Sequence, residues 1–383
     1  GGIPTEALMP AGFVRVVFPD FDDTRVHMGS FKRFPSIDAM RGITVAGMLL
    51  VNGPGSWDHV FWPLSHSAWN GCTPADLVFP FFLFLVGVSV ALAILPRLEQ
   101  GVAPASLRNA ALRRALRIVA LGVALNALAA WWPPGHELRW PGVLQRIGVC
   151  FAVTAMMAVY TPRRAWWIAI VALLAGYTAL LLSRGTLAKW DSIVDHVDGA
   201  VFGRHVWETN AITGQVHDPE GLLSTLPAIA SSLLGLCAGV WLRARKLGFL
   251  LMAGAAAVAL GWLWSQWIPL NKNLWTPSFV LWTGGWAMLA MLVFHWLVDV
   301  RGWPAWGRRF GVNAIAAYAG SELVLVVLPA MGWQQSIYQH LFASWIAPLA
   351  GLRVASLAFG LAFVALWWLI VYAMDRRHVY LKL

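Results

Sequence analysis

Long apolar runs dominate this chain, and polar connections separate each run from the next. A helix that crosses a bilayer needs roughly 20 apolar residues to span roughly 30 Å of hydrocarbon. Runs of this kind lie at roughly 37–52, 76–95, 111–132, 142–160, 164–183, 221–242, 247–268, 277–298, 312–331 and 352–374. The sequence therefore predicts an all-α fold, a polytopic membrane helix bundle of about ten transmembrane helices.

The composition agrees with a lipid environment and leaves little chain for a second domain. Hydrophobic residues make up 59% of the 383 residues and charged residues 12%, whereas a soluble domain is about half apolar and about a quarter charged. We expect residues 31–383 to form one transmembrane domain and residues 1–30 to be an N-terminal extension or an expression remnant. The segment 335–348 is too short and polar to span, which predicts an interfacial piece.

The basic residues are distributed unevenly between alternate connections. One set of connections carries clusters such as Arg113, Arg114 and Arg117, whereas the alternate set carries few cations. This positive-inside pattern predicts that both termini are cytoplasmic. The net charge of +10 then reflects topology, so nucleic acid is not an expected partner. The long connections 53–75 and 184–220 fall on the extracytoplasmic side, where we expect the chemistry.

The three cysteines, Cys72, Cys150 and Cys237, are an odd number without CxxC spacing. This pattern indicates neither a disulfide framework nor a zinc site. We therefore expect no metal in the mechanism.

His66, in the first long outer connection, is a candidate for acid–base or nucleophilic chemistry. A neutral imidazole accepts a proton near pH 7 or is itself acylated. The alternative is an interfacial histidine packed among Trp62 and Trp69. Other histidines compete for the same role, and spacing alone does not choose between them: His59, His136, His196, His205 and His217.

Two further polar residues flank His66 in the sequence. Thr73, Pro74 and Asp76 match the N-cap, N1 and N3 positions of a helix capping box. Asp76 either caps this helix or orients the second ring nitrogen of His66, as the acid of a triad does, and both roles are compatible. Asn52 either donates its amide to a developing oxyanion or closes the end of the first span.

Polar groups also lie at the starts of later runs. Gln145 and Arg146 lie one turn inside the run 142–160, where a cation needs a partner such as Glu322 or a cavity. Asp218 and Glu220 are expected to cap the run 221–242 or to bind a ligand. The amides and ammonium of the 271–273 segment suit sugar hydroxyls as well as an ordinary water interface: Asn271, Lys272 and Asn273.

Several of these stretches resemble the transmembrane acyltransferases typified by heparan-α-glucosaminide N-acetyltransferase and their shorter bacterial relatives linked to N-acetylglucosamine use. The similarity runs in family order across roughly residues 33–383, and the block that begins at His66 is its most specific part. The matching blocks are S-I-D-A-M-R-G, L-V-N-G-P-G, H-S-A-W-N-G-C-T-P-A-D-L-V-F-P-F-F-L-F, P-G-V-L-Q-R-I-G, D-P-E-G-L-L-S-T-L-P-A-I, N-K-N-L-W and G-V-N-A-I-A-A-Y.

The resemblance implies that residues 31–383 form an acyltransferase domain that moves acetyl from cytosolic acetyl-CoA to a glucosamine-type amine on the extracytoplasmic side. It implies catalytic roles for His66 and Asn52, and we add Asp76 to this set. Expected ligands of acetyl-CoA are Arg41, Arg113, Arg114, Arg117, Gln145, Arg146, Arg308 and Arg309. Expected ligands of the amino sugar are Trp69, Asn70, Asp218, Glu220, Asn271, Lys272 and Asn273.

The residues leave other classes open. Buried Arg146 and Glu322 with proline-interrupted helices also suit an amino-sugar transporter without acyl-transfer chemistry, and polar helix contacts would suit an envelope scaffold. For the enzyme, direct transfer and an acetyl-histidine intermediate are both compatible with the sequence. We expect the bacterial inner membrane as the location, and a homo-oligomer is allowed.

Overall fold

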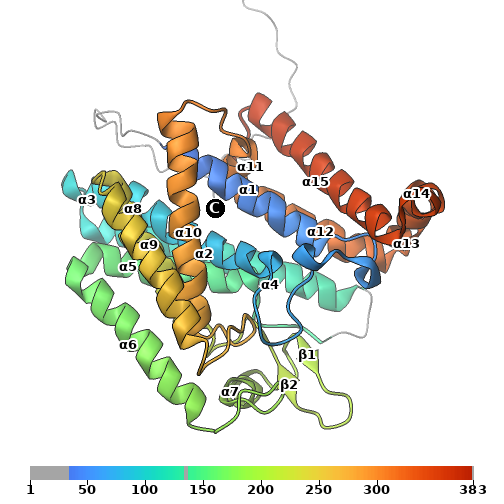
Figure 1. Ribbon diagram of the computed structural model, residues 1–383, viewed down its shortest axis with the longest axis horizontal. Helices are drawn as coiled ribbons and strands as arrows, with labels where there is room; N and C mark the ends of the chain where they lie inside the picture. Colours follow the sequence, from blue (N-terminus) through green and yellow to red (C-terminus); the bar gives the residue numbers. More distant parts are fainter. Residues whose placement is uncertain (1–33, 133–136, 382–383) are drawn as a thin grey trace, which may run out of the picture. The chain divides into compact units, whose positions relative to one another are not determined.

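The computed structural model describes residues 34–132 and 137–381 of the chain (Figure 1). The helices of the first half are α1 (Pro35–Asn52), α2 (Pro74–Ala93), α3 (Leu95–Glu99), α4 (Pro104–Trp131), α5 (Val143–Tyr160), α6 (Arg163–Leu182) and α7 (Ile193–Phe202). Those of the second half are α8 (Thr225–Arg243), α9 (Leu247–Trp264), α10 (Pro277–Phe294), α11 (Arg308–Val312), α12 (Ala314–Ala330), α13 (Trp333–Tyr338), α14 (Ser344–Ala350) and α15 (Leu352–Arg376).

Shorter elements complete this part of the chain. Single 3-10 turns lie at Trp57–His59 and Trp62–Leu64, and π-helical turns extend α10 over His295–Val300 and join α13 to α14 over Gln339–Ala343. Two strands, β1 (Glu208–Thr209) and β2 (Val216–His217), pair antiparallel with Glu208 opposite His217.

The predicted all-α polytopic helix bundle is confirmed. Each apolar run identified in the sequence coincides with a helix, and 8 helices of the described residues are long and apolar enough to cross a membrane. A ninth candidate arises if α12 and the segment 333–350, which meet at 91°, count as one bent span. Helix α1 fills the first predicted run but is not one of these candidates. The count of about ten and the side of the termini stay predictions.

Helices α2 and α8 form the centre of the bundle, and glycines bring their backbones into contact. A Cβ at Gly87 of α2 would lie 1.8 Å from the carbonyl oxygen of Ser232, and one at Gly235 of α8 would lie 1.9 Å from that of Phe84. Small residues of this kind allow the close helix approach typical of membrane proteins. The two helices therefore cannot approach each other more closely at these positions.

Replacing Gly235 with alanine is expected to destabilise the bundle by about 1–3 kcal/mol, because the methyl group overlaps a carbonyl that cannot move aside. The matched control is Gly248→Ala in α9, where nothing lies within 4 Å of the added carbon. There alanine is expected to be neutral or to stabilise the helix by up to about 1 kcal/mol. Melting temperatures in detergent measure both; equal values for the two variants would contradict the close contact.

Three long connections meet at the end of the bundle where α2 begins. Gly71 N–H donates to the Leu270 carbonyl at 2.7 Å, which joins the α1–α2 connection to the α9–α10 connection. Trp69 Nε1 donates to the Leu187 carbonyl at 2.9 Å, which joins the first of these to the connection after α6. Figure 1 shows these loops beside α7, β1 and β2. Residues far apart in the sequence are thus gathered around the start of α2.

Candidate active site

The start of α2 places Asp76 at the base of the site. Thr73 is the N-cap, Pro74 follows at N1 and Asp76 lies at N3, so the predicted cap is confirmed. Asp76 Oδ2 accepts hydrogen bonds from the Thr73 N–H at 3.0 Å, the Thr73 hydroxyl at 3.1 Å and the Ser67 N–H at 3.1 Å. These donors, with the helix dipole, stabilise the negative charge of a carboxylate that has no exposed surface.

The other oxygen of Asp76 contacts His66. Asp76 Oδ1 lies 2.7 Å from His66 Nδ1. An ionised carboxylate only accepts hydrogen bonds, so Nδ1 carries the proton and Nε2 is left as the basic nitrogen of the neutral ring. Asp76 therefore caps α2 through Oδ2 and orients the His66 ring through Oδ1. The side chain of His66 is 36% exposed, which leaves the ring accessible from the loop side.

Lys272 lies on the same imidazole ring. Its Nζ is 3.2 Å from His66 Nε2 and 3.3 Å from Nδ1, and it is 3.9 Å from Asp76 Oδ1. Burial lowers the pKa of the Lys272 ammonium, and the charges of Asp76 and Glu220 oppose that shift. Asp76, His66 and Lys272 thus form a contiguous set of acid, base and amine.

Amide pairs hold this set in place. Asn271 is fully buried; its Nδ2 donates to Asn70 Oδ1 at 3.1 Å, and its Oδ1 accepts from the Leu274 N–H at 2.8 Å. Asn273 is half-buried in the same loop. Trp69 anchors its indole on the Leu187 carbonyl. These contacts fix the two loops, and sugar binding by the same residues stays a prediction.

Asn52 is the last residue of α1, and its side chain faces α12. Its Nδ2 donates to Glu322 Oε1 at 3.1 Å. The expectation that Glu322 pairs with Arg146 is therefore wrong, because the acid accepts from Asn52 instead. The expected contribution of Asn52 to an oxyanion stays a prediction.

Arg146 finds its partners at the loop that precedes α8. The guanidinium is 2% exposed, donates to the Gly221 carbonyl at 3.3 Å and to the Ser224 hydroxyl, and lies 5.1 Å from the Trp275 ring centroid. Gln145 donates to the Trp140 carbonyl at 3.1 Å. Both residues lie at the N-terminal end of α5, the end that carries the His66 loops.

Asp218 and Glu220 do not cap α8, which corrects the expectation from the sequence. The helix begins at Thr225, and both acids lie in the loop before it, where they form ion pairs with Arg139. Arg139 Nε donates to Asp218 Oδ2 at 2.8 Å, and Arg139 Nη2 donates to Asp218 Oδ1 at 2.6 Å and to Glu220 Oε2 at 2.5 Å. Burial alone would raise the pKa of the Glu220 carboxyl, but the cations Arg139 and Arg146 lower it overall.

A second group of arginines lies far from His66 along the helices. Arg41 of α1 donates to the Gly311 carbonyl at 2.7 Å, to Asp38 Oδ1 at 2.7 Å and to the Ser89 hydroxyl at 3.5 Å. Ser89 follows Asp76 by more than three turns of α2, which corresponds to roughly 20 Å at 1.5 Å per residue. Arg114 lies close enough to Arg41 for the two charges to interact.

The other cations expected at this end have separate surroundings. Arg309 lies 3.6 Å from Asp375 Oδ2 and 4.6 Å from the Tyr372 ring centroid. Arg113 and Arg308 are exposed, and Arg117 is half-buried on α4. The expectation that all of these bind acetyl-CoA stays a prediction.

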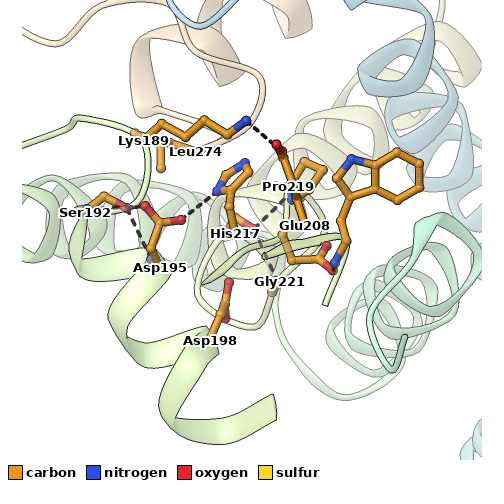
Figure 2. A network of polar contacts seen from close by, with 12 residues as sticks. Lys189, Ser192, Asp195, Asp198, Glu208, His217, Pro219, Gly221 and Leu274 are labelled. Atoms are coloured by element: carbon orange, nitrogen blue, oxygen red, sulfur yellow. Dashed lines mark hydrogen bonds and ion pairs between the residues drawn. The ribbon is translucent and has the colours of Figure 1, made fainter. Parts of the chain in front are cut away.

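A second histidine–carboxylate pair is in contact with Trp69. This pair was not predicted from the sequence. His217 Nδ1 is 2.6 Å from Asp195 Oδ1, and both side chains are buried. Figure 2 shows this pair beside Ser192, with the Lys189–Glu208 ion pair nearby. The Trp69 ring meets the His217 ring edge to face at 5.2 Å. The pattern Ser192-x-x-Asp195, a capping box at the start of α7, was the available signal.

The remaining competing histidines have no comparable arrangement in the part of the chain that the structure describes. His205 Nδ1 contacts the Leu138 carbonyl at 2.8 Å, and His196 Nδ1 contacts the Ser192 carbonyl at 2.9 Å. His59 lies half-buried in the first connection. His136 falls outside the described residues. His66 is therefore the candidate that combines a buried carboxylate partner with an accessible ring.

Asp198, beside the second pair, should make stability depend on pH. Burial raises the pKa of its carboxyl from 3.8 to about 7. Between roughly pH 4 and pH 7 the folded state therefore holds a proton that the unfolded state has lost, so stability falls as pH rises through this window. An asparagine side chain cannot ionise, so the melting temperature of Asp198→Asn is expected to fall less than that of the wild type from about pH 4.5 to about pH 7.5. Parallel curves would contradict the shift.

Comparison with known proteins identifies the family. A family model described as "Heparan-alpha-glucosaminide N-acetyltransferase, catalytic" matches residues 33–265. The chain is 27% identical over 421 aligned positions to heparan-alpha-glucosaminide N-acetyltransferase of Mus musculus, covering 92% of this chain and 61% of that protein. It is 28% identical over 419 positions to the Homo sapiens protein of the same name, covering 92% and 60%. The chain thus spans about three fifths of the length of these curated relatives, and it belongs to the heparan-alpha-glucosaminide N-acetyltransferase catalytic-domain family.

Proposed function

We propose that this chain is a transmembrane N-acetyltransferase that moves an acetyl group from cytosolic acetyl-CoA to the amine of a glucosamine-type sugar on the extracytoplasmic side. The observation that carries the proposal is the Asp76–His66 pair, with a basic ring nitrogen on an accessible imidazole. The names of the relatives supply the reaction class. The acceptor class follows from the same names and from the polar groups around His66.

In this proposal His66 Nε2 accepts the proton of the sugar amine as the amine attacks the thioester carbonyl. Asp76 is a positioning residue, because it fixes the tautomer and orientation of the ring and stabilises the imidazolium that forms. The tetrahedral adduct then collapses, the C–S bond breaks, and the CoA thiolate takes the proton. The alternative route begins with acetylation of His66 itself, followed by attack of the amine on acetyl-imidazole.

The donor would reach His66 from the opposite end of the bundle. Arg41 contacts Ser89, which lies roughly 20 Å from Asp76 along α2. Arg41 and its neighbour Arg114 are the arginines proposed to bind the CoA phosphates, since guanidinium groups bind phosphate in a bidentate manner. The uncharged pantetheine arm would cross the apolar interior toward the thioester position. The positive-inside pattern supports this orientation. In a bacterium the inner membrane separates such a donor from such an acceptor.

The direct test uses purified protein in detergent with acetyl-CoA and glucosamine. Free thiol and N-acetylglucosamine are expected to appear in equal amounts, and omission of the sugar should abolish the second product. An amino-sugar transporter gives the opposite result: in proteoliposomes it moves radiolabelled glucosamine, and in detergent it releases no thiol. That outcome would show that the protein is a carrier and not an enzyme.

A further inference from the structure

We propose that Lys272 is a site of self-acetylation, with the enzyme's own amine reacting in place of the sugar amine when no acceptor is bound. This inference rests on the proposed N-acetyltransferase function. It concerns a covalent modification of the chain itself, which that function does not require.

The geometry places the amine of Lys272 close to the nitrogen that an acceptor must approach. A general base needs its proton donor within about 2.6–3.2 Å, so the amine of any acceptor has to approach the basic nitrogen of His66. Lys272 Nζ lies 3.2 Å from that nitrogen. Asp76, at 2.7 Å from Nδ1, orients the ring. Lys272 Nζ is also 3.3 Å from Nδ1, so the amine lies over the face of the imidazole. The amine, the base and the orienting acid thus form one contiguous cluster, with the amine at proton-transfer distance from Nε2.

The surroundings keep this amine near the ring. The preceding residue, Asn271, is bonded to Asn70 of the His66 loop, and Leu270 accepts the Gly71 N–H. The charged groups that face the ammonium are Asp76, Glu220 and Arg146, together with the Cys72 thiol. Burial disfavours the charged form of the amine, which raises the fraction of neutral nucleophile at a given pH.

The reaction balances without any further reagent. Neutral Nζ attacks the thioester carbonyl carbon, and a C–N bond forms while His66 Nε2 takes a proton from nitrogen. The C–S bond then breaks, and the departing thiolate takes that proton and leaves as CoA thiol. The product is N-acetyl-lysine, an uncharged amide that no longer forms the ion pair with Asp76. An acceptor sugar competes for the same position and is expected to protect Lys272.

The test incubates the purified protein with acetyl-CoA and maps acetyl-lysine by peptide mass spectrometry over time. Lys189 and Lys246 are internal controls, because Lys246 is exposed and the side chain of Lys189 is 35% exposed against 18% for Lys272. Unassisted acetylation follows exposure and would favour the two controls. We expect the initial rate at Lys272 to exceed theirs by roughly 10²-fold, the scale of general-base assistance, and to fall when glucosamine is added.

Three variants complete the experiment. His66→Ala and His66→Gln should reduce acetylation of Lys272 to the level of the controls, and agreement between them excludes a folding defect specific to one. Lys272→Arg keeps a cation beside Asp76 but cannot form acetyl-lysine. It should therefore remove the thiol released in the absence of sugar, whereas an acetyl-histidine intermediate would still release it.

The outcomes separate this inference from the proposed function. If N-acetylglucosamine forms while Lys272 remains unmodified without sugar, self-acetylation is wrong and the enzyme assignment stands. Equal acetylation of all three lysines, or unchanged acetylation in both His66 variants, also overturns it. If neither the sugar nor Lys272 is acetylated by the folded protein, the enzyme assignment itself is wrong.

Discussion

Replacing His66 with alanine is expected to lower the rate of N-acetylglucosamine formation by roughly 10²–10⁴-fold, the range that general-base catalysis contributes. The variant loses the ring nitrogen that accepts the amine proton, and Asp76 Oδ1 loses its 2.7 Å partner. The measurement is the formation of free thiol and acetylated sugar from saturating acetyl-CoA and glucosamine. The melting temperature should fall only modestly, because the buried Asp76 carboxylate loses one partner but keeps the donors on Oδ2.

The matched control is His205→Ala. His205 is also exposed on a loop, but its Nδ1 contacts only the Leu138 carbonyl and has no carboxylate partner among the described residues. Its removal should leave the rate of acetyl transfer within about twofold of the wild type. Equal rates for wild type and His66→Ala would remove His66 from the mechanism. A comparable loss in both variants would point to a general disturbance of the loops that carry the two histidines.

Arg139→Met is expected to have the largest effect on stability, a loss of about 3–5 kcal/mol, because it removes the cation that pairs directly with two buried carboxylates. Asp218 and Glu220 both accept from the same guanidinium, and their side chains are 0% and 9% exposed. Without Arg139 the two carboxylates face each other in a desolvated site. The apparent melting temperature in detergent should therefore fall steeply, and more at neutral than at acidic pH, where the Glu220 carboxyl takes up a proton.

Arg204→Met provides the control for this prediction. Arg204 lies 3.9 Å from Glu137, but the two side chains are 71% and 48% exposed, and an exposed pair contributes about 0–1 kcal/mol. Adding Asp218→Asn and Glu220→Gln to Arg139→Met should recover part of the lost stability, since the unpaired charges are then gone. If the triple variant is no more stable than Arg139→Met, the loss does not come from these charges.

Most of the helical architecture could be predicted from the sequence. The apolar runs have the length that hydrocarbon thickness imposes, so hydropathy alone located the long helices. The start of α8 was misplaced, because Asp218, Pro219 and Glu220 read as the first turn of a helix. In the fold the acids are engaged by Arg139, which lies 79 positions before Asp218. A local pattern carries no information about such a partner.

Contacts of the candidate site between residues close in the sequence could be predicted, whereas contacts between distant segments could not. His66 and Asp76 are only 10 positions apart within one connection, so the capping box and the motif together indicated their contact. Lys272 lies 206 positions from His66, and its place on the imidazole ring depends on how α2 and α10 pack. The His217–Asp195 pair was missed because it forms within a long loop whose path hydropathy does not determine.

Two hydrogen bonds join the α1–α2 connection to the α9–α10 connection, one between Asn70 and Asn271 and one between Gly71 and Leu270. These bonds limit how the site can be engineered. The loop that carries His66 cannot be transplanted into a related protein alone, since its amide partners would stay behind. A functional chimera has to exchange both connections together. A fragment cut at residue 265, where the family match ends, would keep the imidazole and its acid but lose the surface against which they are held.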